Sequence, residues 1–196
     1  MANLDLEAIH AWVDEQWESH VLPSLSDFIE IPALSPAFDE DWAANGYLDD
    51  TIDLFLGWLT SLPMKGMSCN VHRLEGRTPV LTITIEGTGE GEVLFYSHLD
   101  KQPPVTGWSE GKGPWLPVRE DPWLYGRGSV DDGYGGYLSV LSILALQQHG
   151  IPHPKATYLI ETCEESGSFD LPAYLDELSD ILGTPDLVVV MDSGAG

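Results

Sequence analysis

Apolar residues recur every third or fourth position in three stretches of the chain. This spacing predicts helices, because residues three and four apart share one helix face. The stretches are residues 6–17, 52–59 and 137–144, and residues 171–182 predict a fourth helix. Proline and glycine interrupt helices, so Pro32 and Pro36 end the first helical region, Pro63 closes the second and Gly150 the third.

Four apolar runs between and after these helices predict strands. Residues 79–87 alternate and are rich in β-branched side chains, whereas residues 91–100 form a nearly continuous apolar run, as in a strand covered on both faces. The other two runs are residues 156–162 and 185–192. A long loop rich in Gly, Pro and Trp is predicted over residues 101–122. Strands that alternate with helices of this length predict an α/β fold with a largely parallel sheet.

Acidic residues and one histidine follow the predicted extended segments. The positions are His98 with Asp100, Asp131 with Asp132, Glu164 with Glu165, and Asp192. Ligands of α/β sheets bind beyond the carboxyl ends of the strands, so we expect these side chains to gather at one edge. A single Asp after a strand is usually a turn former or a helix N-cap. Four such clusters with a histidine among them indicate a site.

The residue types at this edge suit zinc or a similar divalent metal, because they offer one imidazole and several carboxylates without thiolates. His98 and Asp100 point to the same side of an extended chain, so Asp100 can hydrogen-bond the second ring nitrogen of a metal-bound His98. Two metals about 3.5 to 4 Å apart need an anionic bridge, which a carboxylate can supply. Of Glu164 and Glu165, one can then bind metal while the other accepts a proton from water.

Charge and composition limit the other classes of function. The 196 residues include 32 Asp and Glu but only 8 Lys and Arg, with a net charge of -24, which argues against nucleic-acid and anionic-membrane partners. The sequence contains no apolar stretch of about 18 residues, so it predicts no membrane span. The N-terminus also lacks the pattern of a secretory signal. The 2 cysteines are far apart in sequence, so we expect a reducing, cytoplasmic location.

Four motifs resemble those of the co-catalytic zinc exopeptidases, a family that includes aminoacylase, acetylornithine deacetylase, succinyl-diaminopimelate desuccinylase, glutamate carboxypeptidase and carnosinase. They are SHLDKQPP at residues 97–104, LYGRGSVDDG at 124–133, CEESGS at 163–168 and VVMDSG at 189–194. Within the family, the first and third motifs are most similar to carnosinase-type dipeptidases. The resemblance implies a three-layer α/β fold, with a largely parallel mixed sheet and helices on both faces.

The resemblance also implies four metal ligands, which are His98, Asp131, Glu165 and Asp192. His98 and Asp192 would bind one metal, Glu165 would bind the other, and Asp131 would bridge the two. The implied cofactor is Zn²⁺, with two ions per full-length chain, and Mn²⁺ or Co²⁺ are alternatives.

Two further residues have implied catalytic roles. Glu164 would be the general base, and Asp100 would orient His98. Asp132 has no ligand role by this match. The resemblance further implies a cis peptide bond between Asp131 and Asp132.

The chain departs from the family pattern in two ways. After the Asp pair, Gly133 and Tyr134 replace the usual Lys and Gly. Family members also carry a lid or dimerisation domain after the strand with Asp192, and a final histidine ligand near the far C-terminus. Residues 1–196 have neither, so we expect them to be the N-terminal portion of a truncated metallopeptidase catalytic domain. The full-length protein would form a homodimer through the lid, and the isolated chain would be inactive.

These implications favour a metal-dependent hydrolase that cleaves the amide bonds of dipeptides or short peptides through metal-activated water and a glutamate general base. An N-acyl amino acid deacylase would use the same site chemistry and is the alternative enzyme. A non-catalytic metal-binding fragment is a third interpretation. Glu164 argues against it, because a pure metal site needs no free base.

Overall fold

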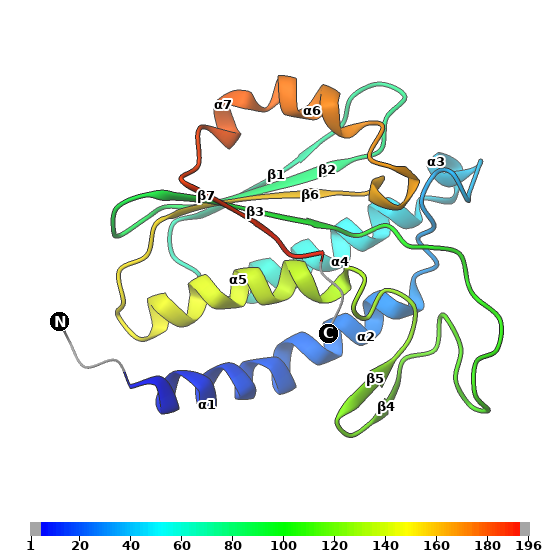
Figure 1. The fold of residues 1–196 in the computed structure, drawn as a ribbon, viewed down its shortest axis with the longest axis horizontal. Coiled ribbons are helices and arrows are strands. Elements are labelled where there is room, and N and C mark those ends of the chain that lie inside the picture. The colour runs from blue at the N-terminus through cyan, green and yellow to red at the C-terminus, as the bar shows by residue number, and fades with distance from the viewer. Residues whose placement is uncertain (1–4, 193–196) are drawn as a thin grey trace.

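The middle layer of the molecule is a five-stranded β-sheet with helices on both faces (Figure 1). The computed structural model describes residues 5–192. The strand order is β1 (Met67–His72), β2 (Val80–Ile85), β6 (Lys155–Glu161), β3 (Glu92–His98) and β7 (Leu187–Val190). The predicted three-layer α/β fold is therefore confirmed.

The sheet is mixed, as predicted, and its parallel part lies on the side of the candidate site. β3 pairs in parallel with β6 and with β7, whereas β2 pairs antiparallel with both β1 and β6. The sequence prediction missed β1, a short edge strand with half-buried and exposed side chains. The parallel arrangement places the carboxyl ends of β3, β6 and β7 at one edge of the sheet, where α/β proteins bind their ligands.

The strand β7 lies at the edge of the sheet. It pairs with β3 on one side, and Leu187, Val188 and Val190 are 58%, 53% and 56% exposed. Neighbouring residues of a strand point to opposite faces, so apolar side chains of β7 reach solvent on both faces of the described sheet.

The larger helical layer covers the lower face of the sheet in Figure 1. Its elements are α1 (Leu6–Gln16), a π-helical turn (Trp17–Val21), α2 (Leu22–Glu30), α4 (Tyr47–Ser61) and α5 (Gly133–Gln148). The first predicted helix therefore continues to Glu30 and ends before Pro32, as expected. The main hydrophobic core lies between this layer and the sheet and includes Phe28, Phe55 and Tyr137.

A smaller layer covers the upper face. It consists of α6 (Leu171–Glu177) and α7 (Ser179–Leu182), which bury Tyr174 and Leu182 against the sheet. The sequence predicted one helix over residues 171–182. The structure divides it at Leu178, whose backbone leaves helical geometry (φ -98°, ψ 10°).

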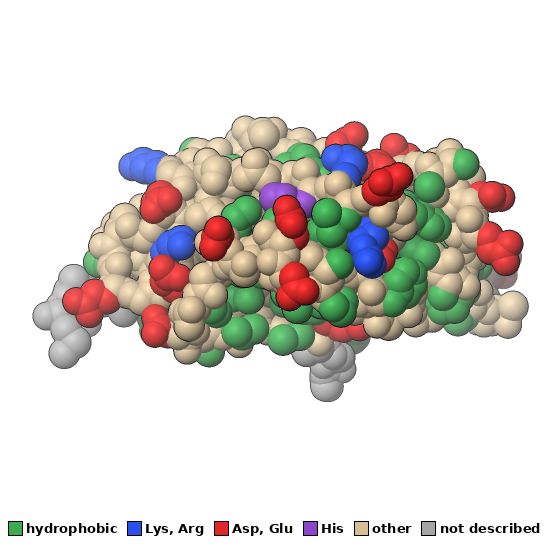
Figure 2. All heavy atoms as spheres, turned by 90° about the horizontal axis from the view of Figure 1, so that it is seen from above, with side chains coloured by type: hydrophobic (Ala, Val, Ile, Leu, Met, Phe, Trp, Pro, Cys, Tyr) green, Lys and Arg blue, Asp and Glu red, His purple; other side chains and the backbone are tan. Residues whose placement is uncertain are grey.

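The end of the predicted loop over residues 101–122 forms the strand β4 (Val118–Glu120), which pairs antiparallel with β5 (Trp123–Tyr125) just beyond the loop. One further short helix is α3 (Trp42–Asn45). Acidic side chains are spread over the face that carries α6 and α7, with a few basic ones between them (Figure 2). Among residues 5–192, no helix has both the length and the apolar character needed to cross a bilayer.

Candidate active site

The fold brings all the predicted site residues together at one edge of the sheet. His98 ends β3, Asp131 lies in the loop before α5, Glu164 and Glu165 begin a 3-10 turn after β6, and Asp192 follows β7. Their side-chain oxygens and the His98 ring form two groups in which the ligand atoms lie within 4.8 Å of one another. The groups are His98 with Asp131 and Glu165, and His98 with Glu164 and Asp192. His98 is thus common to both, and the presence of Glu164 in a ligand group was not predicted.

The ring of His98 is fixed at one nitrogen and free at the other. Its side chain is fully buried, and Nδ1 lies 3.0 Å from the main-chain oxygen of Asp100 and 3.3 Å from Asp100 Oδ1. Both neighbours are acceptors, so Nδ1 carries a hydrogen and the neutral ring keeps its lone pair on Nε2. That nitrogen lies 3.3 Å from Asp131 Oδ1 and 3.8 Å from Glu164 Oε2. In the neutral ring, Nε2 therefore turns its lone pair toward a position between these carboxylates that suits a cation.

Asp100 connects this histidine to the two glutamates. Its carboxylate is fully buried and accepts a hydrogen bond from the main-chain N–H of Glu164 (3.1 Å) and another from that of Glu165 (3.0 Å), one on each oxygen. The orienting role of Asp100 requires its contact with His98, and the role itself stays a prediction. The bonds to the two amides were not predicted from the sequence, because they depend on how closely the ends of β3 and β6 approach.

Two more side chains support the site, and the sequence analysis assigned a role to neither. The Gln102 amide nitrogen donates to Glu165 Oε2, and the buried Asp132 accepts from the main-chain N–H of His98 (3.3 Å). Gln102 does lie inside the first motif, which was the available signal. The peptide bond between Asp131 and Asp132 is cis, as predicted.

Crowding of charge perturbs the protonation of these groups. Burial disfavours a charge on His98, but the neighbouring carboxylates of Asp100 and Asp131 outweigh it and raise the pKa of His98 to about 11. Burial also raises the pKa values of Asp132 and Glu165 to about 7 and raises the pKa of Glu164. Carboxylates that gather without a fixed positive partner favour protons on themselves and on the histidine between them.

A divalent cation fits this arrangement. Within residues 5–192, His98 Nε2 and Glu165 Oε1 are buried atoms without a hydrogen-bond partner, which is unusual for buried polar atoms. Both belong to the same group of possible ligands. One imidazole nitrogen with several carboxylate oxygens is a donor set that suits zinc, manganese or cobalt.

The metal-free chain should become less stable as the pH rises from 5 to 7. The pKa values of Asp132 and Glu165, raised by burial to about 7, and of His98, raised to about 11, mean that the folded chain holds protons that the unfolded chain releases in this range. Stabilisation by a raised folded-state pKa is complete at low pH and is lost as the pH rises. For a chain of this size, each kcal/mol lost from the free energy of unfolding lowers the thermal midpoint by roughly 2 to 4 °C. We therefore expect the thermal midpoint measured in EDTA to fall by at least about 3 °C between pH 5 and pH 7.

Two variants test whether Asp132 contributes to this pH dependence of stability. Asp132→Asn should flatten the pH dependence, whereas Asp180→Asn, a change at an exposed position of α7, should leave it as it is. A thermal midpoint that rises from pH 5 to pH 7 in EDTA would contradict the assignment.

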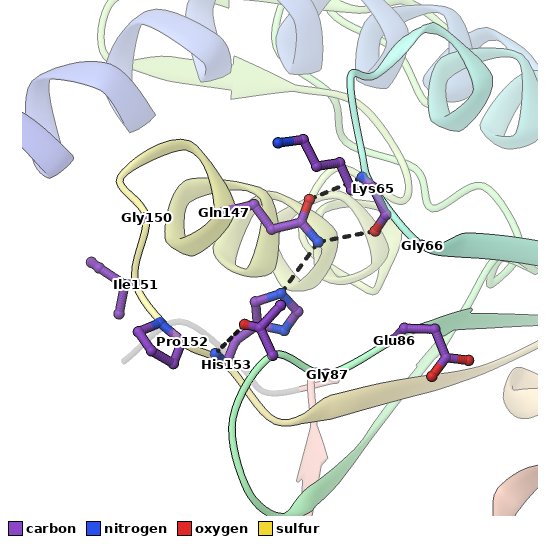
Figure 3. A pocket seen from close by; sticks show the side chains of 10 residues that line it. Lys65, Gly66, Glu86, Gly87, Gln147, Gly150, Ile151, Pro152 and His153 are labelled. Atoms are coloured by element: carbon purple, nitrogen blue, oxygen red, sulfur yellow. Dashed lines mark hydrogen bonds between the residues drawn. The ribbon is translucent and has the colours of Figure 1, made fainter.

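A separate cavity lies at the opposite end of the sheet, next to the loop before β1 and the end of α5 (Figure 3). Gln147 Oε1 accepts from the Lys65 N–H (2.9 Å), and its amide nitrogen donates to the Lys65 oxygen (3.0 Å) and to His153 Nε2 (3.2 Å). These bonds hold the loop to the helix. We interpret the cluster as a structural contact and not as a second reactive site.

Comparison with known proteins agrees with the fold and the site region. A family model described as peptidase family M20/M25/M40 matches residues 94–194, more than half of the chain and a range that includes every predicted site residue. Succinyl-diaminopimelate desuccinylase from Zymomonas mobilis is 30% identical over 134 residues, which cover 65% of this chain and 34% of that protein. Beta-Ala-His dipeptidase from Homo sapiens is 29% identical over 107 residues, which cover 53% and 21%.

A solved structure has the same fold. The crystal structure of human carnosine dipeptidase 1 superposes with a TM-score of 0.74 at 22% identity, and the match covers 97% of this chain and 42% of that one. The chain spans about a third or less of the length of the desuccinylase and of the Beta-Ala-His dipeptidase named above.

Proposed function

The chain belongs to peptidase family M20/M25/M40, and from this membership we propose that it forms much of the active site of a metal-dependent hydrolase of dipeptides or short peptides. The observation that carries the proposal is the buried Nε2 of His98, which faces carboxylates from three other segments. We assign metal binding to His98, Asp131, Glu165 and Asp192. We assign the bridging position to Asp131, whose carboxylate lies beside His98 Nε2.

A divalent metal in this position would polarise the substrate carbonyl and lower the pKa of water. The protein groups then have distinct tasks. Glu164 would accept the proton of the attacking water at its side-chain carboxylate, and burial raises the pKa of this carboxyl toward the range in which a general base works best near neutral pH. Asp100 would hold both glutamates through their main-chain N–H groups and would keep the hydrogen of His98 on Nδ1.

Zn²⁺ is the proposed cofactor, with two ions in the full-length protein, and Mn²⁺ or Co²⁺ would suit the same ligands. Because the relatives are much longer than the matched region, we propose that residues 1–196 are the N-terminal portion of the catalytic domain. A lid domain and a further histidine ligand would complete the full-length enzyme, which would form a homodimer in the cytoplasm.

The second candidate is an N-acyl amino acid deacylase. The similarity to a desuccinylase favours it, and the same metal and base would serve its reaction. The test is a panel of dipeptides and N-acyl amino acids, incubated with the full-length protein and zinc. Hydrolysis of dipeptides supports our first proposal, hydrolysis of acyl derivatives alone supports the second, and no hydrolysis by a zinc-loaded protein points to a non-catalytic metal-binding protein.

The 196-residue chain by itself should bind at most about one Zn²⁺ tightly and should show no significant peptidase activity. His98 is common to both ligand groups, and three protein ligands with a water are a usual set for one catalytic zinc. A second ion would be left with carboxylates alone. Calorimetric titration with ZnCl₂ gives the stoichiometry, and a dipeptide assay on the same sample gives the activity. Two tight sites per chain, or turnover like that of the full-length enzyme, would contradict this division.

A further inference from the structure

Lys101 is a completely buried lysine three residues after His98. Its ammonium group donates to the main-chain oxygens of Phe28 (2.5 Å) and Ile31 (2.7 Å), with a longer contact to that of Ile29 (3.4 Å). These carbonyls lie at and just beyond the C-terminal end of α2, where a helix leaves oxygens unpaired and favours a positive charge, whereas burial lowers the pKa of Lys101 to about 7. Within residues 5–192, Lys101 forms no ion pair with a carboxylate, although the protein is strongly acidic.

The main chain of Lys101 is held as firmly as its side chain. Its N–H donates to the Ala33 oxygen (2.9 Å), and its own oxygen accepts from the Ser35 N–H (3.1 Å). Residues 33–37, which follow α2, therefore run alongside the segment that carries His98 and Asp100. We call residues 33–37 the strap.

The stem of Lys101 also packs against the loop that carries Asp131. Gly128 has φ +82°, and a Cβ atom there would lie 2.9 Å from Lys101 Cε and 3.0 Å from the Phe28 ring. The Gly128 oxygen accepts from the Gly133 N–H (2.9 Å) at the start of α5. Lys101 thus fills the space between α2 and the loop before α5, and a larger residue at position 128 would collide with it.

The strap continues from Lys101 to the turn that carries the two glutamates. The Ser35 and Ser166 hydroxyls lie 2.6 Å apart, and the Ala37 N–H donates to Ser166 Oγ (2.8 Å). Ser166 is the last residue of the 3-10 turn that begins at Glu164. One buried lysine and one short strap therefore connect three of the segments that carry proposed ligands.

We propose that Lys101 is a positioning residue of the active site. It would fix the segments bearing His98, Asp131 and Glu165 relative to one another and would touch neither metal nor substrate. The inference rests on the proposed function, because it concerns the geometry of that site. Its physical basis is that neutral replacement would leave the α2 carbonyls buried without a donor, so α2, the strap and the loops would move apart.

The alternative is that Lys101 only caps α2 and stabilises the fold. Coordination geometry separates the two, because a loss of global stability does not change the spectrum of an ion bound to the molecules that remain folded. Bound Co²⁺ has a visible absorption spectrum that depends on the number and arrangement of its ligands, so it is the probe. The variants are Lys101→Met and, as the matched control, Lys155→Met.

Lys155 starts β6 at the far end of the sheet, where its nearest carboxylate is Glu92 at 3.6 Å. The control therefore makes the same chemical and charge change away from the site. In titrations with CoCl₂ alone, we expect Lys101→Met to bind about tenfold more weakly or worse, in the range typical of residues that support metal ligands. Its Co²⁺ spectrum should also change in shape, whereas Lys155→Met should match the unmodified chain in both.

The outcomes distinguish a wrong metal site from a wrong role for Lys101. If the unmodified chain binds no Co²⁺, the proposed metal site itself is wrong. If it binds Co²⁺ and Lys101→Met gives the same affinity and spectrum, the metal site stands and the positioning role is overturned. If circular dichroism shows that Lys101→Met is unfolded, Lys101→Arg takes its place. The larger guanidinium should press on Gly128 and alter the spectrum, and an unchanged spectrum would again overturn the inference.

Discussion

Glu164→Gln should lower the turnover of the full-length enzyme by about 10²- to 10⁴-fold while zinc remains bound, because this is the usual contribution of a general base. The Glu164 carboxylate reaches to 3.8 Å from His98 Nε2, so it lies next to the place where the reacting water would be held. A glutamine has nearly the same shape and keeps an oxygen, but its amide cannot accept the proton of water. The measurements are kcat on a dipeptide and zinc content by atomic absorption.

The neighbouring residue gives the matched comparison. Glu165→Gln makes the same chemical change one position along the chain, and it removes a proposed ligand of the group formed with His98 and Asp131. We expect zinc content to fall in Glu165→Gln and to stay near normal in Glu164→Gln. Equal loss of zinc in the two variants would show that both side chains act as ligands, and the assignment of Glu164 as the base would have to be abandoned.

His98→Ala should weaken zinc binding to the chain by more than about 100-fold, beyond the roughly 10- to 100-fold typical of residues that merely support a ligand. His98 belongs to both ligand groups, so its removal leaves each with carboxylates only. Competition with a coloured chelator measures the affinity. The control is His20→Ala, which removes an exposed histidine from the π-helical turn. Similar affinities for His98→Ala and the unmodified chain would place the zinc elsewhere.

The candidate site was predictable to the extent that it depends on strand ends. His98, Glu164 and Asp192 lie at or just after the ends of apolar runs, and such runs are typical of neighbouring parallel strands, although β7 leaves three of its apolar side chains exposed. The general position of the site therefore follows from local patterns. Asp131 was expected at the end of an extended segment, but that segment is β5 of the small hairpin and not a strand of the main sheet, so the loop before α5 brings Asp131 to the site.

The supporting contacts were not predictable in the same way. Lys101 and Asp132 lie inside the quoted motifs but are charged residue types, and nothing in the local pattern says that they are buried. Their partners are the end of α2 and the main-chain N–H of His98, which come close only after distant segments pack. The edge strand β1 was missed although its residues alternate between apolar and polar, because the run is short and its side chains are only half-buried or exposed.

The exposure of the edge strand β7 has a kinetic consequence for the proposed metal site. Among residues 5–192, it pairs with β3 alone, and its apolar side chains reach solvent on both faces of the described sheet. Strands at the least protected end of a sheet open locally at a lower free energy than the core, so the amides of β7 should exchange with solvent sooner than those of β6. Asp192 lies two residues after the end of this strand. The residence time of a bound ion would then be governed by the fraying of β7, with Asp192 the first ligand to leave and His98 the last.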